Sequence, residues 1–557
     1  MPAQQTLDST ARRSEAQSQP TKQGTLAQWR DVVPLTLVAG LEADRMRLGH
    51  LRGIGNLDGY IVRSPSSLAA PLAAPSQPSR FVAIAPEIYA VDNSALPFSI
   101  NDGPLWAGVG MSTRFLAGFR IESGPLRIIA APELIITQNK YFQLRDTIRF
   151  PAPGVPKERQ GGGYVFPWYI QPYSIDLPLR FGSQRIERLD AGQSTAMINY
   201  RGAAFGVSNE NEWWGPGIRN ALILSNNAPG FPHGFIRTNR PWKTRLGKVE
   251  ARLLIGGLTE SKYFDTTSTN NLRSISAFAV TLRPRFDPDL VLGFSRSVFA
   301  TSKGWGKIPW RILDAFAATG RPNNLPLSDS TLNPGGRDQL FSLFGRWVFP
   351  KDGFEAYAEW ARMEWPLGFK DLLVAPNHTQ GYTLGVQWTR PAFTRSGSVR
   401  FQGEITSVEQ SATFRDRPQG SFYTSRRVIQ GYTQRGQPLA AAIGPGASSQ
   451  WLAADYIQPE WSFGVFAGRI RWNEDIHSTY GFPLYQGYCV HDVSVFPGAR
   501  ATGNHRWGYI SADVAFGNRL NAFFQEQSGC PKGDSVLDIR NRTISVTLGT
   551  FTPGRGH

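Results

Sequence analysis

The stretch MSTRFLAGFRIE, residues 111–122, alternates apolar and polar side chains with a period of two residues. One face carries Met111, Thr113, Phe115, Ala117, Phe119 and Ile121. The other face includes Arg114, Arg120 and Glu122, with Leu116 as its apolar exception. Successive side chains of a β-strand point to opposite faces, so the stretch predicts a strand with one apolar and one charged face.

The same alternation recurs far along the chain. Further examples are FEAYAEW at 354–360, YTLGVQW at 382–388 and SVRFQGEIT at 398–406. In each, one face is apolar and the other carries charged or other polar residues. A soluble β-sandwich would also alternate, so the pattern predicts an all-β protein but leaves the environment of the strands open.

The connections between the strand candidates alternate in length. Short connections lie at 284–289, 350–353, 391–397, 459–462 and 517–518, and long ones at 299–337, 366–379, 411–450 and 475–504. In an antiparallel meander this places all short turns at one end and all long loops at the other, which is typical of outer-membrane barrels. A β-propeller would need a repeat of about 40 residues, and none is found.

These strand candidates predict a large antiparallel transmembrane β-barrel of about 16 to 18 strands. We expect the barrel to occupy residues 80–551, followed by a tail at 552–557. Aromatic residues near strand ends, at 345–350, 364–366 and 471–472, are expected in an interfacial girdle. The predicted location is the bacterial outer membrane, with the long loops extracellular.

Residues 1–79 are predicted to form a periplasmic leader. They comprise a polar, disordered start, one short helix at 41–53, and a linker at 63–80 that is rich in Pro, Ser and Ala. No run approaches the roughly 18 apolar residues of a transmembrane helix. Export to an outer membrane requires a signal peptide, and none is visible in this numbering. We expect a different start site or processing to account for it.

The chain is strongly basic, with a net charge of +16 and 48 Arg against 11 Lys. Arginine suits carboxylates and phosphates, although codon bias would also enrich it. Charged residues expected in the lumen are Arg114, Arg120, Arg346, Glu355, Glu359, Arg400, Glu404, Arg469 and Arg471. They are interpreted either as a salt-bridge lattice that braces the barrel or as a wall that attracts anions.

The sequence predicts no enzyme, no catalytic residues, no metal site and no cofactor. Its seven His form no HExxH motif, and no GxSxG motif occurs. Glu355 and Glu359 lie about 13 Å apart along a strand, beyond the roughly 5 to 9.5 Å of paired catalytic acids. Cys489 and Cys530 both fall at the expected long-loop end, where a disulfide between them is a hypothesis.

One segment does not fit a membrane strand. NEWWGPGIRNALILSNNAPGFPH, residues 211–233, contains a Gly-Pro-Gly turn and is expected to fold inward or to lie at a barrel rim. Tryptophan faces stack on sugar rings and asparagine amides bind hydroxyls, although the segment could equally plug the barrel. The candidate glycan-binding residues here are Trp213, Trp214, Arg219, Asn226 and Asn227.

WWGPG followed by LILSNNA resembles the hallmark of the capsule-assembly Wzi family of outer-membrane proteins. Supporting stretches lie at 93–110, 131–139, 354–362 and 431–450, and the resemblance covers roughly residues 80–551. It implies an 18-stranded barrel whose lumen is occluded by loops, with a small helical part at the N-terminus. It also implies lectin-like, non-catalytic attachment of capsular or exported polysaccharide to the cell surface.

The predicted function is therefore non-enzymatic retention of an exported polysaccharide in capsule assembly. The long loop 411–450 adds Tyr423, Arg426, Arg427, Tyr432 and Arg435 as candidate contacts to acidic sugars, unless it is an ordinary solvated loop. Expected partners are the polysaccharide and outer-membrane lipid, with no nucleic acid, and the expected state is a monomer. The alternative is a substrate-selective porin, which would conduct ions; a barrel enzyme is a weaker rival.

Overall fold

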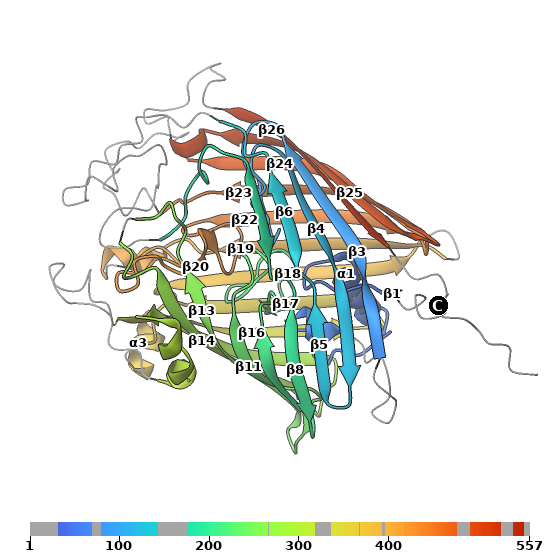
Figure 1. The fold of residues 1–557 in the computed structure, drawn as a ribbon, viewed down its shortest axis with the longest axis horizontal. Helices are drawn as coiled ribbons and strands as arrows, with labels where there is room; N and C mark the ends of the chain where they lie inside the picture. Colours follow the sequence, from blue (N-terminus) through green and yellow to red (C-terminus); the bar gives the residue numbers. More distant parts are fainter. Residues whose placement is uncertain are drawn as a thin grey trace, which may run out of the picture.

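The computed structural model describes ten ranges of the chain. These are residues 32–69, 80–142, 175–265, 267–317, 336–366, 368–392, 396–417, 419–475, 491–524 and 538–550. Nearly all strands in them belong to one antiparallel sheet that closes on itself where β26 pairs with β3, as in Thr543 opposite Asn93. Figure 1 shows the resulting barrel.

The barrel has 18 strands when two interrupted strands are each counted once. Its strands are β3 (Arg80–Asn93), β4 (Gly110–Ser123), β5 (Leu126–Ala130) continued by β6 (Glu133–Thr137), β7 (Ile186–Asp190) continued by β8 (Thr195–Tyr200), β9 (Ala203–Ser208), β11 (His233–Thr238), β13 (Gly247–Thr259), β14 (Leu272–Pro284), β15 (Leu290–Thr301), β16 (Arg337–Phe349), β17 (Phe354–Arg362), β18 (Gln380–Pro391), β19 (Ser398–Ser407), β22 (Ser448–Ile457), β23 (Trp461–Arg471), β24 (Val493–His505), β25 (Gly508–Leu520) and β26 (Ile539–Thr550). The predicted all-β barrel is confirmed.

Shorter elements lie inside the barrel, in its loops or along its rim. They are β1 (Val32–Val33), α1 (Leu41–Leu51), β2 (Val62–Arg63), α2 (Pro65–Leu68), β10 (Trp213–Trp214), β12 (Trp242–Lys243), η3 (Trp305–Lys307), η4 (Pro309–Phe316), α3 (Phe369–Val374), η5 (Ala412–Arg415), β20 (Thr433–Gln434), β21 (Gln437–Pro438) and η7 (Ala522–Phe524). Among the described residues, none of the helices has the length and apolar character needed to span a membrane.

The two faces of the wall differ as the alternation predicts. On β4, Phe115 is 42% exposed while its neighbour Arg114 is 7% exposed. Outward-facing large apolar side chains continue around the barrel, for example Leu384, Phe401 and Leu452. An apolar outer wall around a polar interior is what a bilayer requires of a barrel. Leu116 points inward, as its phase predicts, and packs in a small apolar cluster with Ile84 and Ile129.

Aromatic residues do gather on the outer wall near the short-turn end. Trp347, Trp388 and Trp461 are each between 39% and 47% exposed, and the ring of Trp388 stacks on that of Phe401 at 5.7 Å. Such rings suit the boundary between hydrocarbon and water. Trp472, which the sequence also assigned to this girdle, is different, because its indole N–H donates to Ser494 and its ring lines an interior cavity.

Two predicted connections near the C-terminus are wrong. The proposed loop 475–504 contains strand β24, and the proposed turn at Gly517-Asn518 lies inside β25, where both residues pair with β26. The actual short turn is at residues 506–507, between His505 and Gly508. β24 is rich in small and polar residues, so it lacks a clear apolar stripe, and pairing with its neighbours rather than its own composition makes it a strand.

The N-terminal part is packed into the short-turn end of the barrel. The predicted helix is confirmed as α1, which lies inside the wall in Figure 1. Its Leu48 and Leu51 pack with Val291 and Phe344 of the wall. Residues 63–69, predicted as part of a linker, are instead folded inside the barrel, where they contribute to β2 and form α2. α1 therefore closes this end of the lumen.

Candidate functional site

The predicted inward fold of the tryptophan segment is what the structure shows. Residues 209–232 connect β9 to β11 inside the barrel, and the two tryptophans form β10, which pairs with β2. The Trp214 N–H donates to the carbonyl oxygen of Leu224 at 3.0 Å, which folds the segment back on itself. We call residues 209–232 the plug segment. It joins parts of the chain that are far apart in the sequence.

Both tryptophan rings are completely buried, at 0% exposure. The guanidinium of Arg63 lies 4.9 Å from the centre of the Trp213 ring, and the Trp214 indole N–H donates to the carboxylate of Glu212 at 3.0 Å. Neither ring presents a face on which a sugar could stack. In this conformation the tryptophans are the core of the plug segment, which is the structural alternative that the sequence left open.

Carboxylates of the barrel wall hold the plug segment in place. Glu404 accepts hydrogen bonds from the backbone N–H groups of Ile218, Arg219 and Asn220, at 2.5 to 3.1 Å. The hydroxyl of Tyr357 donates to the same carboxylate at 2.9 Å. Three successive N–H groups around one anion form a nest that satisfies both partners without water. Glu404 is therefore a structural anchor of the plug segment.

Glu359 supports the next part of the plug segment. Its carboxylate accepts the N–H of Leu222 at 3.2 Å. Gly215 has a φ of +124°, and a Cβ added there would lie 2.6 Å from that carboxylate, so only glycine fits. The Gly-Pro-Gly sequence thus permits the close approach of the segment to the wall.

The two asparagines tie three loops together. Asn226 donates through its side chain to the carbonyl oxygen of Asn101 at 2.7 Å. Asn227 donates to the carbonyl oxygen of Pro438 at 3.1 Å and accepts at its own backbone from Gln437. Both side chains are buried, and in this conformation their amide groups form hydrogen bonds within the protein. Arg219 is half-buried, with its guanidinium 5.3 Å from the ring centre of Trp451.

Within the long loop between β19 and β22, residues 419–447 turn inward, while residues 412–416 lie largely exposed. Tyr423 and Tyr432 are 1% and 0% exposed, stack at 6.1 Å between ring centres, and have no accessible face. Arg435 forms an ion pair with Asp190 at 2.6 Å. Arg426 and Arg427 are half-buried, and Arg427 donates to the carbonyl oxygen of Arg337. Residues 419–447 are the second part of the plug and not a solvated loop.

Most of the predicted charged residues do line the lumen. Arg346 forms an ion pair with Glu355 at 2.5 Å, Arg400 pairs with Asp455 and with Asp44 at 2.9 Å, Arg114 pairs with Glu87 at 2.8 Å, and Arg120 pairs with Glu122 at 2.5 Å. Each of these four arginines pairs with a carboxylate. This arrangement is a salt-bridge lattice that braces the barrel and fixes the plug.

The lumen prediction is wrong for Arg469 and Arg471. On β23 these residues share a face with Trp461, Phe463 and Val465, which are about half exposed and point outward. Both arginines lie at the long-loop end of the strand, where Arg471 pairs with Glu409 at 2.5 Å. Alternation fixes which residues share a face, but the neighbouring strands determine which face is the inside.

Cys489 and Cys530 lie outside the described residues, so their pairing stays a prediction. Among the residues that are described, no three His, Cys, Asp or Glu side chains are arranged to hold a metal ion.

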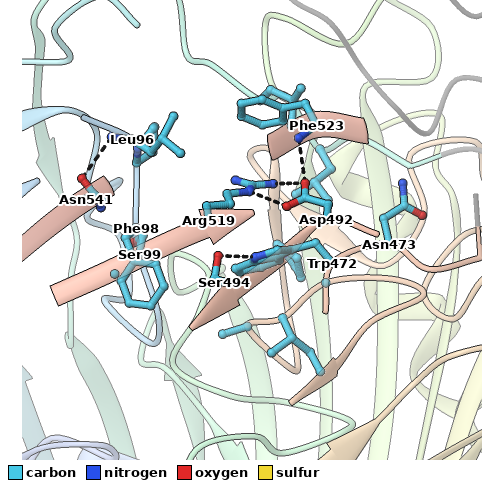
Figure 2. A pocket seen from close by; sticks show the side chains of 18 of the residues that line it. Leu96, Phe98, Ser99, Trp472, Asn473, Asp492, Ser494, Arg519, Phe523 and Asn541 are labelled. Carbon is cyan, nitrogen blue, oxygen red and sulfur yellow. Dashed lines mark hydrogen bonds and ion pairs between the residues drawn. The ribbon is translucent and has the colours of Figure 1, made fainter. Parts of the chain in front are cut away.

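A cavity of about 190 Å³ opens at the long-loop end, and the sequence did not predict it. It lies between the inner faces of β24, β25 and β26 and the inward loops at residues 96–99, 177–179 and 436–445. Figure 2 shows aromatic rings from Phe98, Trp472 and Phe523 around it. Most of the lining is apolar, with a few polar groups among the rings.

The charged groups of the cavity neutralise each other. Arg519 makes two hydrogen bonds to Asp492, at 2.7 and 2.6 Å, and its guanidinium lies 4.3 Å from the ring centre of Phe523. The Phe523 N–H also donates to Asp492, at 2.9 Å (Figure 2). The cavity therefore offers aromatic faces without an unbalanced charge.

Buried polar atoms without a hydrogen-bond partner among the described residues line this cavity on Trp106, Asn518 and Asn473, and Asn473 lacks a partner at both polar atoms of its side chain. It is 5% exposed, and neither its side-chain oxygen nor its nitrogen has a hydrogen-bond partner among the described residues. Its backbone has a φ of +44°, which is uncommon for a residue with a side chain and is tolerated best by asparagine. A buried amide without partners costs free energy, and its persistence is a reason to look for a ligand.

Comparison with known proteins finds a family model that resembles the middle of the chain. Residues 190–457 match the family model "Capsule assembly protein Wzi", and this range contains the whole plug segment. No curated protein matches the sequence significantly. The matched range therefore includes the residues that form the plug.

Solved structures share the fold at low sequence identity. Wzi of Escherichia coli, described as an outer-membrane carbohydrate-binding β-barrel involved in group 1 capsule assembly, is 13% identical, with a TM-score of 0.52 over 85% of each chain. Weaker matches include the outer-membrane channel DcaP of Acinetobacter baumannii, 7% identical with a TM-score of 0.32 over 87% of this chain and 100% of that one. OccK3 of Pseudomonas aeruginosa is 9% identical, with a TM-score of 0.39 over 85% and 95%.

The sequence motif, the matched range and the barrel agree with one another. Residues 190–457 resemble the capsule assembly protein Wzi family, and the chain shares the β-barrel fold of E. coli Wzi.

Proposed function

We propose that this protein holds exported capsular polysaccharide at the cell surface by non-covalent binding, without catalysis. The observation that carries the proposal is the cavity at the long-loop end, which is lined by aromatic rings and by the unpartnered amide of Asn473. Aromatic faces stack on the C–H faces of sugar rings, and an amide offers one acceptor and two donors to hydroxyl groups. The family and the carbohydrate binding described for E. coli Wzi support this proposal.

The filled lumen supports a binding role over a transport role. α1 closes the short-turn end, and the plug segment and residues 419–447 occupy the interior. Their contacts with the wall are buried ion pairs and hydrogen bonds, which are costly to break one partner at a time. A polysaccharide chain would therefore be held at the outer end of the barrel and would not be threaded through it.

The sugar-binding residues in this proposal differ from the first candidates. Phe98, Trp472 and Asn473 would contact a neutral sugar unit in the cavity, because Arg519 is already neutralised by Asp492. Arg426 and Arg427, half-buried on the inward loop, are the proposed contacts for acidic units of the same polymer. The proposed partners are thus the polysaccharide and the surrounding outer-membrane lipid, and the proposed state is a monomer.

The test is a co-sedimentation assay with polysaccharide from the surface of the source cell, combined with planar-bilayer conductance. We expect the folded protein in detergent or vesicles to retain the polysaccharide and to conduct few or no ions. Failure to retain the polysaccharide, together with open-channel conductance, would replace the proposal with a substrate-selective porin. Chain shortening of the polysaccharide by the protein would instead indicate a barrel enzyme.

A further inference from the structure

At the long-loop end, a short helix on the outer wall exposes its apolar side chains and buries its acidic one. In η4, the side chains of Trp310, Leu313 and Phe316 are 85%, 66% and 53% exposed, while Asp314 is buried. In a 3₁₀ helix, residues three apart lie above one another, so these three side chains form one apolar stripe. A helix on a protein in water would bury this stripe and expose the acid.

The helix is held in this orientation by polar contacts beneath it. Ser276 of β14 donates to the carbonyl oxygen of Ile312 at 2.7 Å and accepts from the N–H of Ala315 at 3.1 Å. Arg296 of β15, an outward-facing residue, donates to the carbonyl oxygens of Ala315 and Ala317. The polar side of η4 is therefore satisfied by the wall, and the apolar stripe points away from the protein.

A second short helix repeats the arrangement next to the first. In α3, Phe369, Leu373 and Val374 are 65% to 75% exposed, while Asp371 pairs inward with Arg417 at 3.1 Å. Arg296 links the two helices, because its guanidinium also lies 5.4 Å from the ring centre of Trp365, a few residues before α3. Figure 1 shows α3 outside the barrel at the long-loop end.

We call this surface the outer ledge. It comprises Trp305, Trp310, Leu313 and Phe316 on η3 and η4, with Phe369, Leu373 and Val374 on α3. It continues the apolar outer wall, because Phe278 of β14 packs under Phe316 at 4.9 Å between ring centres. Lys303, Lys307 and Lys370 are exposed beside it and form no ion pair with another described residue. Apolar stripes flanked by lysines are typical of surfaces that lie in a membrane interface.

We propose that the outer ledge is seated in the outer leaflet of the membrane and that its lysines bind the phosphate groups of lipid headgroups. The ledge would thus set the height of the barrel and keep the long-loop end, with its cavity, at the membrane surface. Free-standing in water, this apolar surface would be an aggregation site. The proposal concerns lipid and does not depend on polysaccharide binding.

The depth of the ledge can be measured on the full chain in lipid vesicles. A nitroxide probe on Leu313→Cys, in a Cys489→Ser/Cys530→Ser background, is expected to be accessible to oxygen and protected from a water-soluble nickel chelate. Val386→Cys on the lipid-facing wall and Lys351→Cys in a short turn are the lipid and water controls. A Leu313→Cys probe that behaves like the Lys351→Cys probe would overturn the proposal.

A second measurement avoids the cysteine background. Fluorescence quenching by lipids with brominated acyl chains is expected to fall in Trp310→Phe relative to the unmodified chain, because this ring would contact lipid. Trp214→Phe replaces a buried ring and is expected to leave the quenched fraction unchanged. Equal quenching in the unmodified chain and Trp310→Phe would contradict the insertion of the ledge.

The phosphate contacts have their own test. The combined variant Lys303→Gln/Lys307→Gln/Lys370→Gln is expected to retain about five-fold less phosphatidylglycerol or lipid A after detergent exchange, because each lysine near an anionic surface contributes. The matched control is Lys243→Gln/Arg285→Gln/Lys351→Gln at the opposite end, which should retain as much as the unmodified chain. Unchanged lipid retention in the three-lysine variant would overturn the proposed phosphate contacts. So would complete displacement of lipid by inorganic phosphate at the same phosphate concentration.

Discussion

Arg47 of α1 and Glu355 of β17 form a buried ion pair at 2.6 Å between residues that lie 308 positions apart in the sequence. Glu355 also binds Arg346 and accepts from Gln387, so its carboxylate is enclosed by three donors. Burial by itself disfavours a carboxylate, and the two arginines compensate for it. This contact connects the helix that closes the short-turn end to the barrel wall.

Removing one partner of this pair should open that end of the barrel. Arg47→Met leaves a carboxylate that only Arg346 balances, and loss of one partner of a buried pair typically costs about 3 to 5 kcal/mol. We expect a lower unfolding temperature, faster proteolysis near α1 and increased ion conductance. Glu460→Gln, an exposed residue of a short turn, is the control and should change none of these. Wild-type conductance and stability in Arg47→Met would contradict the role of the pair.

Replacing Glu404 should loosen the plug more than removing any one of the groups that donate a hydrogen bond to its carboxylate. Glu404→Gln replaces the anion at the centre of three backbone N–H groups by a neutral amide whose NH₂ group repels them. We expect the plug segment to loosen, seen as faster amide hydrogen exchange at residues 218–222 and as channel openings in planar bilayers.

Tyr357→Phe is the matched control for this variant, because it removes one hydrogen bond to the same carboxylate. Its expected cost is about 1.5 to 3 kcal/mol, the range for one hydrogen bond to a charged group, and the plug should stay closed. Equal effects of Glu404→Gln and Tyr357→Phe would contradict the importance of the nest.

The buried tryptophans should matter for stability and not for direct sugar contact. Trp213→Ala removes a ring with 0% exposure, and such changes typically cost about 3 to 5 kcal/mol. We expect lower stability, with unchanged polysaccharide affinity of the fraction that remains folded. Trp507→Ala, at an exposed turn, should change neither quantity. Loss of affinity in fully folded Trp213→Ala would restore the stacking role that the sequence suggested.

Asn473→Ala should weaken polysaccharide retention without loss of stability. The amide has no partner among the described residues, so its removal is expected to take away a hydrogen bond to the ligand and no internal one. The expected loss of affinity is about five- to ten-fold, measured by co-sedimentation, which corresponds to roughly 1 kcal/mol. Asn199→Ala, at the opposite end of the barrel, is the control. Unchanged retention in Asn473→Ala would exclude the cavity as the sugar site.

Asp475 should make the long-loop end sensitive to pH. Burial raises the pKa of this carboxyl from its ordinary 3.8 to about 7, and Glu409 and Glu474 act in the same direction. A raised pKa means that the folded state favours the neutral form. The neutral carboxyl of Asp475 therefore contributes its full stabilisation to the folded state below about pH 3.8. This contribution is lost as the pH rises through about 7.

The carboxyl accepts the N–H of Gln410 at 2.8 Å, and Gly446 lies against it, so the affected contacts join two inward loops. We expect amide hydrogen exchange at residues 409–411 and 444–447, corrected for the intrinsic rate, to accelerate between about pH 4 and 7 and to level off above that range. Asp475→Asn stays neutral and should lose this dependence. The same pH dependence in Asp475→Asn would assign it to other groups.

The alternation on β4 and β17 was sufficient to predict strands and their faces, because each strand of a membrane barrel contacts lipid on one side and the protein interior on the other. β24 escaped prediction because its small and polar residues form no apolar stripe. Arg469 and Arg471 were assigned to the wrong face because a period of two residues does not say which side is the interior. The cavity escaped prediction because it is lined by residues from several separate loops.

By itself the sequence determined the barrel, the approximate number of its strands, the two ends defined by loop length, and the plug motif at residues 211–233. These properties depend on local periodicity, turn residues and motif composition, which are readable along the chain. Only the tertiary structure decided that the loops fill the lumen, that the tryptophans are buried, and that Asn473 has no partner in the part of the chain that the structure describes. The physical reason is that these outcomes depend on contacts such as that of Glu404 with Ile218, which are 186 positions apart in the sequence and meet only when the barrel closes.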